Sequence, residues 1–355
     1  MHHRTRFNNF FLVARWDPEA ALRQLAQALL RGLHPDKGET IYLIIDDSKT
    51  ATRGQAMDAV AKMKDPTTDA YIWGHQDVWG TLRCRPHGIP WGIRLYVKQE
   101  AGAAVGVPFQ KTTPLAAHLM REFNAPAGVR VVVWCDADDL CPTVVKACRD
   151  KRFPCASPLK SHRSLCKPGW KLTAGGYGRK QFRRWRTDTL VLTTPHGSAR
   201  YRFADAGWLG VSKLGALHVV FSRNGTAKKI LGLVTDAPQL SAADIIRTYD
   251  KRWTIAPWVK DTKPLLGLGQ YQNRSDWAAV TPRHLVCFAS ALLTHRRLAR
   301  PGAQGHRTSD KAAPVSTAVA QDQLRSLLWE DLIAYLQAQR HDQPVLEELE
   351  RLRVA

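Results

Sequence analysis

The hydrophobic pattern at the start of the chain predicts a helix followed by a buried strand. Residues 17 to 34 open with Asp17-Pro18, a favourable N-cap and first-turn pair, and their leucines recur at helical spacing. The run from Thr40 to Ile45 is apolar and rich in β-branched residues, as in a strand buried on both faces. It changes abruptly to Asp46-Asp47-Ser48, which we expect to lie at the end of that strand.

The next segments alternate between strand and helix patterns. Residues 71–82 and 92–97 read as strands, and their short connection favours antiparallel pairing. Residues 112–123 have helical spacing, and 128–134 form a second buried apolar run that meets an acidic end at Asp136. A helix is expected soon afterwards. Carboxylates at the ends of two adjacent central strands could together bind a hard divalent cation such as Mg²⁺, whereas one such end alone could equally be a turn or a helix cap.

Between about 153 and 235 the texture changes to interleaved basic and aromatic residues, densest at 179–186, with short strand-like runs after them. Lysine and arginine there could neutralise phosphates, and an aromatic ring could stack on an exposed base. The alternative is an ordinary solvated basic surface over core aromatics. We expect a β-rich segment with a basic face.

The last third reads mainly as helix. Ser241 followed by Asp244 resembles a capping box, and further helical patterns cover 283–298 and 320–338. Residues 301–319 are polar and rich in proline, glycine and serine, which indicates a linker.

Net charge narrows the class of partner. The chain has 52 Lys and Arg against 31 Asp and Glu, a formal charge of +21. Such an excess favours a polyanionic partner, with nucleic acid first. An acidic membrane is less favoured because neither a basic amphipathic helix nor a lipidation signal is evident, and a basic enzyme without such a partner is the plain alternative. With no run near the roughly 18 apolar residues of a membrane span and no signal peptide, we expect a soluble cytoplasmic protein.

Cysteine spacing argues against a metal knuckle. Five of the seven cysteines lie between Cys135 and Cys166, but none form a CxxC pair. Because these spacings are wider than those of zinc sites, buried free thiols are favoured over zinc ligands.

One later stretch carries a specific pattern. Tyr249, Arg252, Ala256 and Lys263 read Y-x2-R-x3-A-x6-K, followed by Gly267-Leu268 and by Tyr271-Gln272-Asn273-Arg274-Ser275. With the two acidic strand ends, this stretch resembles the DDE transposases of bacterial insertion sequences, in the superfamily with the signature Y-x2-R-x3-E-x6-K. The resemblance covers roughly residues 40 to 295.

The resemblance implies an α/β fold, namely an RNase H-like mixed sheet with flanking helices, interrupted by a β-rich insertion. The corresponding divisions are an N-terminal helical segment 1–39, a first part of the core 40–152, the insertion 153–235, a second part of the core 236–300, and a linker with a C-terminal helix 301–355.

The resemblance also implies a site and a reaction. Asp47 would be the first catalytic aspartate, favoured over Asp46 because a small polar residue follows it, and Asp136 would be the second. Both would bind metal in a site for two Mg²⁺ ions, with Mn²⁺ as a substitute, that cleaves DNA and transfers strands by cut and paste. The expected partners are double-stranded transposon ends and target DNA, bound by a dimer associated with the bacterial nucleoid.

DNA contacts are implied at other positions. Tyr249, Arg252, Lys263 and Arg274 would bind DNA, and arginine can hold a phosphate through two hydrogen bonds. A flipped base at the transposon end would stack on an aromatic residue of the insertion, for which Trp185 and Trp208 are the candidates.

Position 256 departs from the pattern, because alanine stands where the family has the third acid. On a helix, Asp250 and Asp261 both lie more than 100° around the axis from it, so neither replaces the missing ligand. We therefore expect a transposase that is inactive or nearly so. The alternatives are a transposase-derived DNA-binding protein that does not cut and, less favoured because the Y-R-K spacing is complete, an RNase H-like nuclease outside transposition.

Overall fold

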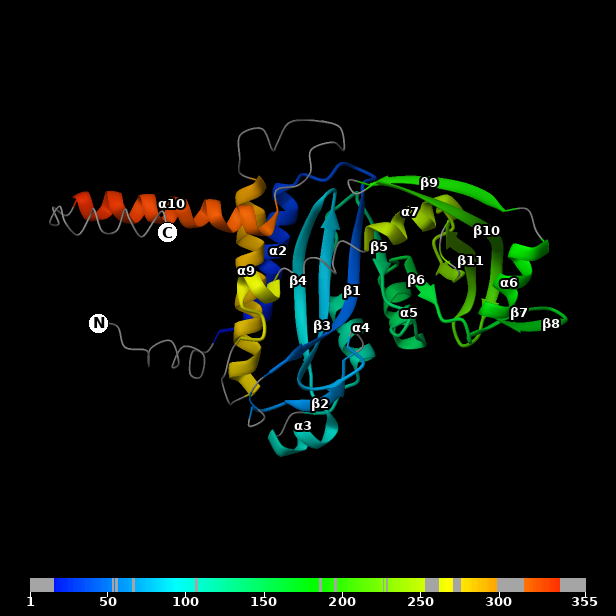
Figure 1. Cartoon of the computed structure of the whole chain (residues 1–355), viewed down its shortest axis with the longest axis horizontal. Coiled ribbons are helices and arrows are strands. Elements are labelled where there is room, and N and C mark those ends of the chain that lie inside the picture. The colour runs from blue at the N-terminus through cyan, green and yellow to red at the C-terminus, as the bar shows by residue number, and fades with distance from the viewer. Residues whose placement is uncertain are drawn as a thin grey trace.

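A computed structural model describes residues 16–52, 54, 57–65, 68–105, 108–184, 187–194, 197–225, 227, 229–252, 262–270, 276–298 and 316–338. These residues form a mixed α/β fold with one twelve-stranded mixed sheet and eight helices (Figure 1). The strand order along the sheet is β2-β3-β1-β5-β6-β12-β11-β10-β7-β8, with β4 beside β3 and β9 beside β10.

The first half of the sheet combines antiparallel and parallel pairs. β1 is antiparallel to β3, which is antiparallel to β2 and β4, while β5 is parallel to both β1 and β6. The bounds are β1 Thr40–Ala51, β2 Ala61–Lys64, β3 Tyr71–Cys84, β4 His87–Tyr96, β5 Arg130–Trp134 and β6 Cys155–Leu159. The predicted strands and the antiparallel pairing of β3 with β4 are confirmed.

One predicted boundary is wrong. We expected the first strand to end before Asp46, but β1 continues through both acids to Ala51. The reason is its partner, because β3 pairs with β1 from Arg83 all the way to Gly74. Polar side chains that suggest a turn are tolerated here inside a strand whose backbone is hydrogen-bonded along its length.

The region 153–235 is rich in strands, as predicted, and its strands continue the same sheet. β12 pairs with β6, so the basic segment joins the first half of the sheet directly. The basic stretch before Trp185 is helical. The bounds are β7 Ser164–Lys167, β8 Trp170–Thr173, α6 Ala174–Arg184, β9 Asp188–Thr194, β10 Gly197–Val211, β11 Gly215–Asn224 and β12 Leu231–Thr235.

Helices pack on both faces of the first half of the sheet. Leu115 and Leu119 of α4 and Val144 of α5 share one buried cluster with Leu43 and Ile45 of β1. On the opposite face, α2 and α9 pack over β3 and β4, and α7 lies over β1, β5 and β12. The bounds are α2 Pro18–Gly32, α3 Gln99–Val105, α4 Thr112–Glu122, α5 Pro142–Asp150, α7 Ala242–Arg252, α9 Asp276–Leu298 and α10 Thr317–Ala338.

Two predicted helix starts are confirmed by their caps. Asp17 Oδ1 accepts hydrogen bonds from the backbone N–H groups of Glu19 and Ala20 at 3.0 and 2.9 Å. Ser241 Oγ accepts one from the backbone N–H of Asp244 at 3.2 Å. In the parts of the chain covered by the structure, no helix has the length and hydropathy of a membrane span.

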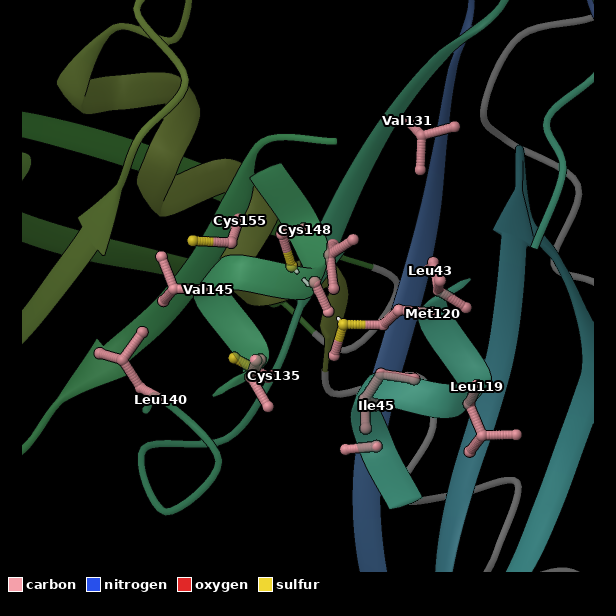
Figure 2. Packing of buried hydrophobic residues seen from close by; sticks show 14 of the residues in the cluster. Leu43, Ile45, Leu119, Met120, Val131, Cys135, Leu140, Val145, Cys148 and Cys155 are labelled. Atoms are coloured by element: carbon pink, nitrogen blue, oxygen red, sulfur yellow. Dashed lines mark hydrogen bonds between the residues drawn. The ribbon is translucent and has the colours of Figure 1, made fainter. Parts of the chain in front are cut away.

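The sulfur atoms of the cysteine-rich region belong to the core. Figure 2 shows Cys135, Cys148 and Cys155 among leucine, isoleucine and valine side chains, with Cys148 Sγ 3.5 Å from Met120 Sδ. Burial raises the pKa of the Cys135 thiol well above its usual range, which keeps it protonated. All seven cysteines are free and five are buried, as predicted, but Cys141 is half-buried and Cys166 is exposed.

Candidate active site

Two neighbouring parallel strands bring the predicted acids to one place. β1 and β5 pair from Thr40 and Arg130 up to Ile44 and Trp134. Two residues further on in each chain segment stand Asp46 and Asp136. Beyond Ile44, β1 continues along β3 while β5 has ended, so the sheet opens between the two strands. We call this opening after Ile44 and Trp134 the fork.

Asp46 and Asp47 lie on opposite faces of β1. Tyr42 and Ile44 pack in one cluster with Trp134 of β5 and Tyr249 of α7. Because side chains alternate along a strand, Asp46 falls on this face and Asp47 on the other. Trp134, the last residue of β5, lies on the Asp46 face, and Asp136 follows it by two residues. Asp46 therefore lies on the face of the sheet that α7 covers. The serine after Asp47 had instead favoured Asp47 as the first catalytic aspartate.

The Asp47 carboxylate is nevertheless close to the other acids. Burial is the largest of the causes that raise the pKa of Asp47, and the negative charges of Asp136 and Asp138 also raise it. A hydrogen bond donated by Gln76 Nε2 to Asp47 Oδ2 and the charge of Lys49 act in the opposite direction. Both aspartates of β1 thus contribute to one negatively charged group at the fork.

Asp139 is a member of this group that sequence reasoning did not assign. It lies in the turn after β5, where the backbone N–H of Leu140 donates to Asp136 O at 3.2 Å. Its side chain is 5% exposed. Burial, followed by the charges of Asp47, Asp46, Asp136 and Asp138, raises the pKa of Asp139 to about 7. The run Asp136-Ala137-Asp138-Asp139 was the available signal, but nothing in it distinguishes a buried acid from an exposed one.

Two residues of the Y-R-K pattern reach the strands that carry the acids. The ring of Tyr249 lies 5.8 Å from that of Trp134, the last residue of β5. Lys263 Nζ donates to the backbone carbonyl of Lys49 at 3.1 Å, three residues after Asp46 on β1. The fold therefore gathers at the fork residues that are more than 100 positions apart in the sequence.

Several predicted site residues lie outside what the structure describes. These are the side chain of Arg252 at the end of α7, and Trp185, Ala256 and Arg274 in full. The absence of a third acid at position 256 is therefore known from the sequence alone.

Trp208 lies in another part of the sheet. It stands on β10, which β6, β12 and β11 separate from β5. Its side chain is 45% exposed and stacks on His218 with ring centroids 5.8 Å apart. His218 Nε2 is 2.7 Å from Asp205 Oδ1, so a chain of side-chain contacts holds the ring at the surface.

A buried ion pair joins β3 to α9 near the fork. Asp77 and Arg283 are 0% and 1% exposed, and Arg283 Nε lies 2.8 Å from Asp77 Oδ1. Asp77 is the β3 partner of Ser48, two residues after Asp46. The neighbouring His75 is also buried, which with the charge of Arg283 lowers its pKa to about 4 and keeps it neutral.

The chemistry of the fork suits a hard cation, although its geometry is incomplete. Carboxylate oxygen is the ligand that Mg²⁺ prefers. Burial, followed by the charges of neighbouring acids, raises the pKa values of Asp47 and Asp139, and a bound cation would offset those charges. Across the described ranges, no three His, Cys, Asp or Glu side chains stand close enough together to hold a metal ion by themselves. Neither a protein-family model nor a curated protein matches the chain.

Proposed function

We propose that this chain is a DNA-binding protein of the DDE transposase type, with an RNase H-like core, whose cleavage activity is weak or lost because alanine occupies position 256. The observation that carries the proposal is the meeting of three sequence features at the fork. The aspartates of β1, Asp136 after β5, and Tyr249 with Lys263 all reach the same two strands. A mixed sheet with helices on both faces is the setting that the proposal requires.

Each side chain has a role in this proposal. Asp136 and one or both aspartates of β1 would hold the metal ions, which would supply the activation of water or of a 3′-hydroxyl for attack on a phosphodiester. Lys263 and Arg252 bind phosphates of the DNA end, and Tyr249 positions the end of α7 by packing on Trp134. The net charge of +21 strengthens the attraction of the duplex to this region.

Restoring the missing acid tests the catalytic part of the proposal. Ala256→Glu should raise Mg²⁺-dependent cleavage of DNA that carries the terminal sequences of the element by about a hundredfold or more, because a third carboxylate completes the metal site. Asp136→Asn added to Ala256→Glu should abolish the gain. If the unaltered protein cuts as fast as the Ala256→Glu variant, the reasoning about position 256 is wrong.

The same background separates the two aspartates of β1. In the Ala256→Glu protein, Asp46→Asn should abolish cleavage if the acid on the α7 face holds the metal, and Asp47→Asn should do so if the acid bonded to Gln76 does. Each variant serves as the control for the other, because both remove one negative charge from adjacent positions of one strand.

A second function is favoured by Ala256 itself. A transposase-derived protein that holds DNA ends or regulates without cutting needs the phosphate-binding residues but not the third acid. Tight binding of terminal DNA, combined with no cleavage even after Ala256→Glu, would favour this alternative.

A further inference from the structure

Two arginines on neighbouring strands of the basic segment both contact one aromatic ring. Arg202 of β10 and Arg223 of β11 are direct cross-strand partners. The guanidinium carbons of Arg202 and Arg223 lie 5.7 and 5.4 Å from the centre of the Phe182 ring, near the end of α6. Arg202 also donates from Nη2 to Thr187 Oγ1 at 2.9 Å. Both guanidinium groups are therefore held in place before any ligand binds.

These arginines lie on the face of the sheet that α6 covers. Phe221, which shares the face of Arg223 by alternation, lies directly against Gly178 of α6. The opposite face packs against α7 through Phe203 and Val220. Other exposed basic residues stand on the same strand face or on α6 itself, and we call the whole set the arginine surface: Arg179, Lys180, Arg183, Arg200, Arg202 and Arg223.

The arginine surface lacks negative partners within the described residues. Several arginines elsewhere in the molecule are paired, such as Arg85 with Glu39 and Arg94 with Glu122. None of the six basic residues of the arginine surface forms an ion pair with a described residue. The nearest acid along the sheet, Asp188, is the partner of Phe203 and so stands on the α7 face.

Like charges directly opposite each other on antiparallel strands destabilise a sheet. Contact with the Phe182 ring offsets part of the repulsion between Arg202 and Arg223, because the ring face is negative. An anion between the two guanidinium groups would remove it altogether. Arginine presents donors in a planar fork that matches phosphate oxygens, so the ligand chemistry is that of a phosphate group.

We propose that the arginine surface binds the phosphate backbone of duplex DNA without reading its sequence. This inference rests on the proposed function, which makes DNA the substrate. It adds a second DNA-contact region on α6 and on β10 and β11, two strands that β5, β6 and β12 separate from β1. A lipid phosphate is less favoured, because membrane-binding surfaces insert several apolar side chains beside their cations. Here the ring of Phe182 is half-buried against two guanidinium groups, and one exposed apolar side chain, Val191 opposite Arg200, lies among six basic residues.

The test compares two double variants that remove the same net charge. Arg202→Gln with Arg223→Gln alters the arginine surface. Lys64→Gln with Lys146→Gln is the control. These exposed lysines lie on β2 and α5, outside the arginine surface, and are paired with Asp69 and Asp150. Binding of a fluorescent duplex of about 25 base pairs is measured by anisotropy between about 50 and 200 mM salt, the range over which phosphate contacts weaken.

The arginine variant should bind about tenfold more weakly, and the slope of log affinity against log salt should fall by about 2, one for each lost phosphate contact. Its Tm should equal or exceed that of the unaltered protein, since a repulsive pair has been removed. The lysine control should keep both affinity and slope. A purely structural role for the arginines would instead lower Tm and leave the salt slope unchanged.

Other results would overturn the inference in distinguishable ways. If the unaltered protein binds duplex and the arginine variant binds it equally well, the surface is wrong and the proposed function stands. If the unaltered protein binds no duplex at about 50 mM salt, the proposed function fails as well. Binding of phosphatidylserine vesicles in place of duplex, abolished in the arginine variant, would assign the surface to a membrane.

Discussion

At the scale of single residues, the fork is a place where negative charge is concentrated. Lys160 pairs with Asp138, and the buried Asp139 feels the charges of four other acids, Asp46, Asp47, Asp136 and Asp138. A carboxyl in that position holds its proton into the neutral range. The cost of ionising it falls on the folded state alone, because the unfolded chain exposes the group to water.

This environment predicts an unusual dependence of stability on pH. Because the folded pKa of Asp139 is raised to about 7, the folded state binds the extra proton between about pH 4 and 7, so its stability falls as pH rises through that window. Asp139→Asn removes the ionisation. The variant should gain on the order of 2 kcal/mol of unfolding free energy relative to the unaltered protein between pH 5 and pH 8, measured by urea denaturation.

Asp138→Asn provides the matched control. The Asp138 side chain is 74% exposed and pairs with Lys160, and its charge is the smallest of the four that raise the pKa of Asp139, so its loss should produce a much smaller gain in this pH window. Equal pH profiles for Asp139→Asn and the unaltered protein would mean that Asp139 is ionised at neutral pH in the folded state.

Sequence reasoning selected some of the acids at the fork and passed over others for physical reasons. Asp136 was selected because a buried strand that meets an acid is visible in the order of residues. Asp139 was missed because its burial comes from the turn between β5 and α5, which no periodicity records. The choice between Asp46 and Asp47 depends on strand alternation in three dimensions, which the serine after Asp47 does not report.

At the scale of elements, α9 is fixed to the sheet by charge as well as by apolar contacts. The pair of Asp77 and Arg283 joins β3 to α9, with both side chains fully buried. Burial raises the pKa of Asp77, and Arg283 opposes that rise. Ser48, opposite Asp77, belongs to β1, the strand that carries Asp46 and Asp47.

Removing one partner of this pair should cost much more than removing both. Arg283→Met leaves Asp77 buried without its cation and should lower the unfolding free energy by about 3–5 kcal/mol. Adding Asp77→Leu should recover most of that loss, because two apolar side chains can fill the space. The measurement is chemical denaturation of the two variants. A loss below about 1 kcal/mol for Arg283→Met would show that apolar packing alone holds α9.

Two elements show the limits of local pattern. The polar residues after Ile45 suggested a turn, but pairing with β3 extends β1 to Ala51. The segment of α6 begins Ala174-Gly175-Gly176-Tyr177-Gly178, and glycine disfavours helix. Gly178 is nonetheless required there, since a Cβ at that position would lie 2.7 Å from the ring of Phe221. Tertiary contacts decide both cases.

At the scale of the whole molecule, the basic segment and the first half of the sheet share one core. Val133 of β5, Val234 of β12 and Val219 of β11 belong to the same buried cluster. The resemblance predicted a β-rich insertion at residues 153–235. It did not predict that this segment would share the buried core of the first half of the sheet. Pairing of β6 with β12 joins residues about 75 positions apart, and no local pattern specifies such a neighbour.

A shared core predicts that the two regions unfold together. Val234→Ala should lower stability by about 2 kcal/mol and shift a single thermal transition, with tryptophan fluorescence and far-ultraviolet circular dichroism coinciding. Among the described residues, the fully buried tryptophans Trp79, Trp91 and Trp134 all lie in the first half of the sheet, so their fluorescence reports on that half. Two separated transitions, with fluorescence unaffected by Val234→Ala, would contradict a single cooperative unit.

The fork has a further consequence for association between molecules. An open strand edge inside a sheet exposes backbone donors and acceptors to which a foreign strand could add, a common route to aggregation. Here the molecule occupies two of these groups with its own charged side chains. Asp46 accepts from the backbone N–H of Asp47, and Lys263 donates to the carbonyl of Lys49. Residues at the fork thereby also protect the edge of β1 from pairing with a strand of another chain.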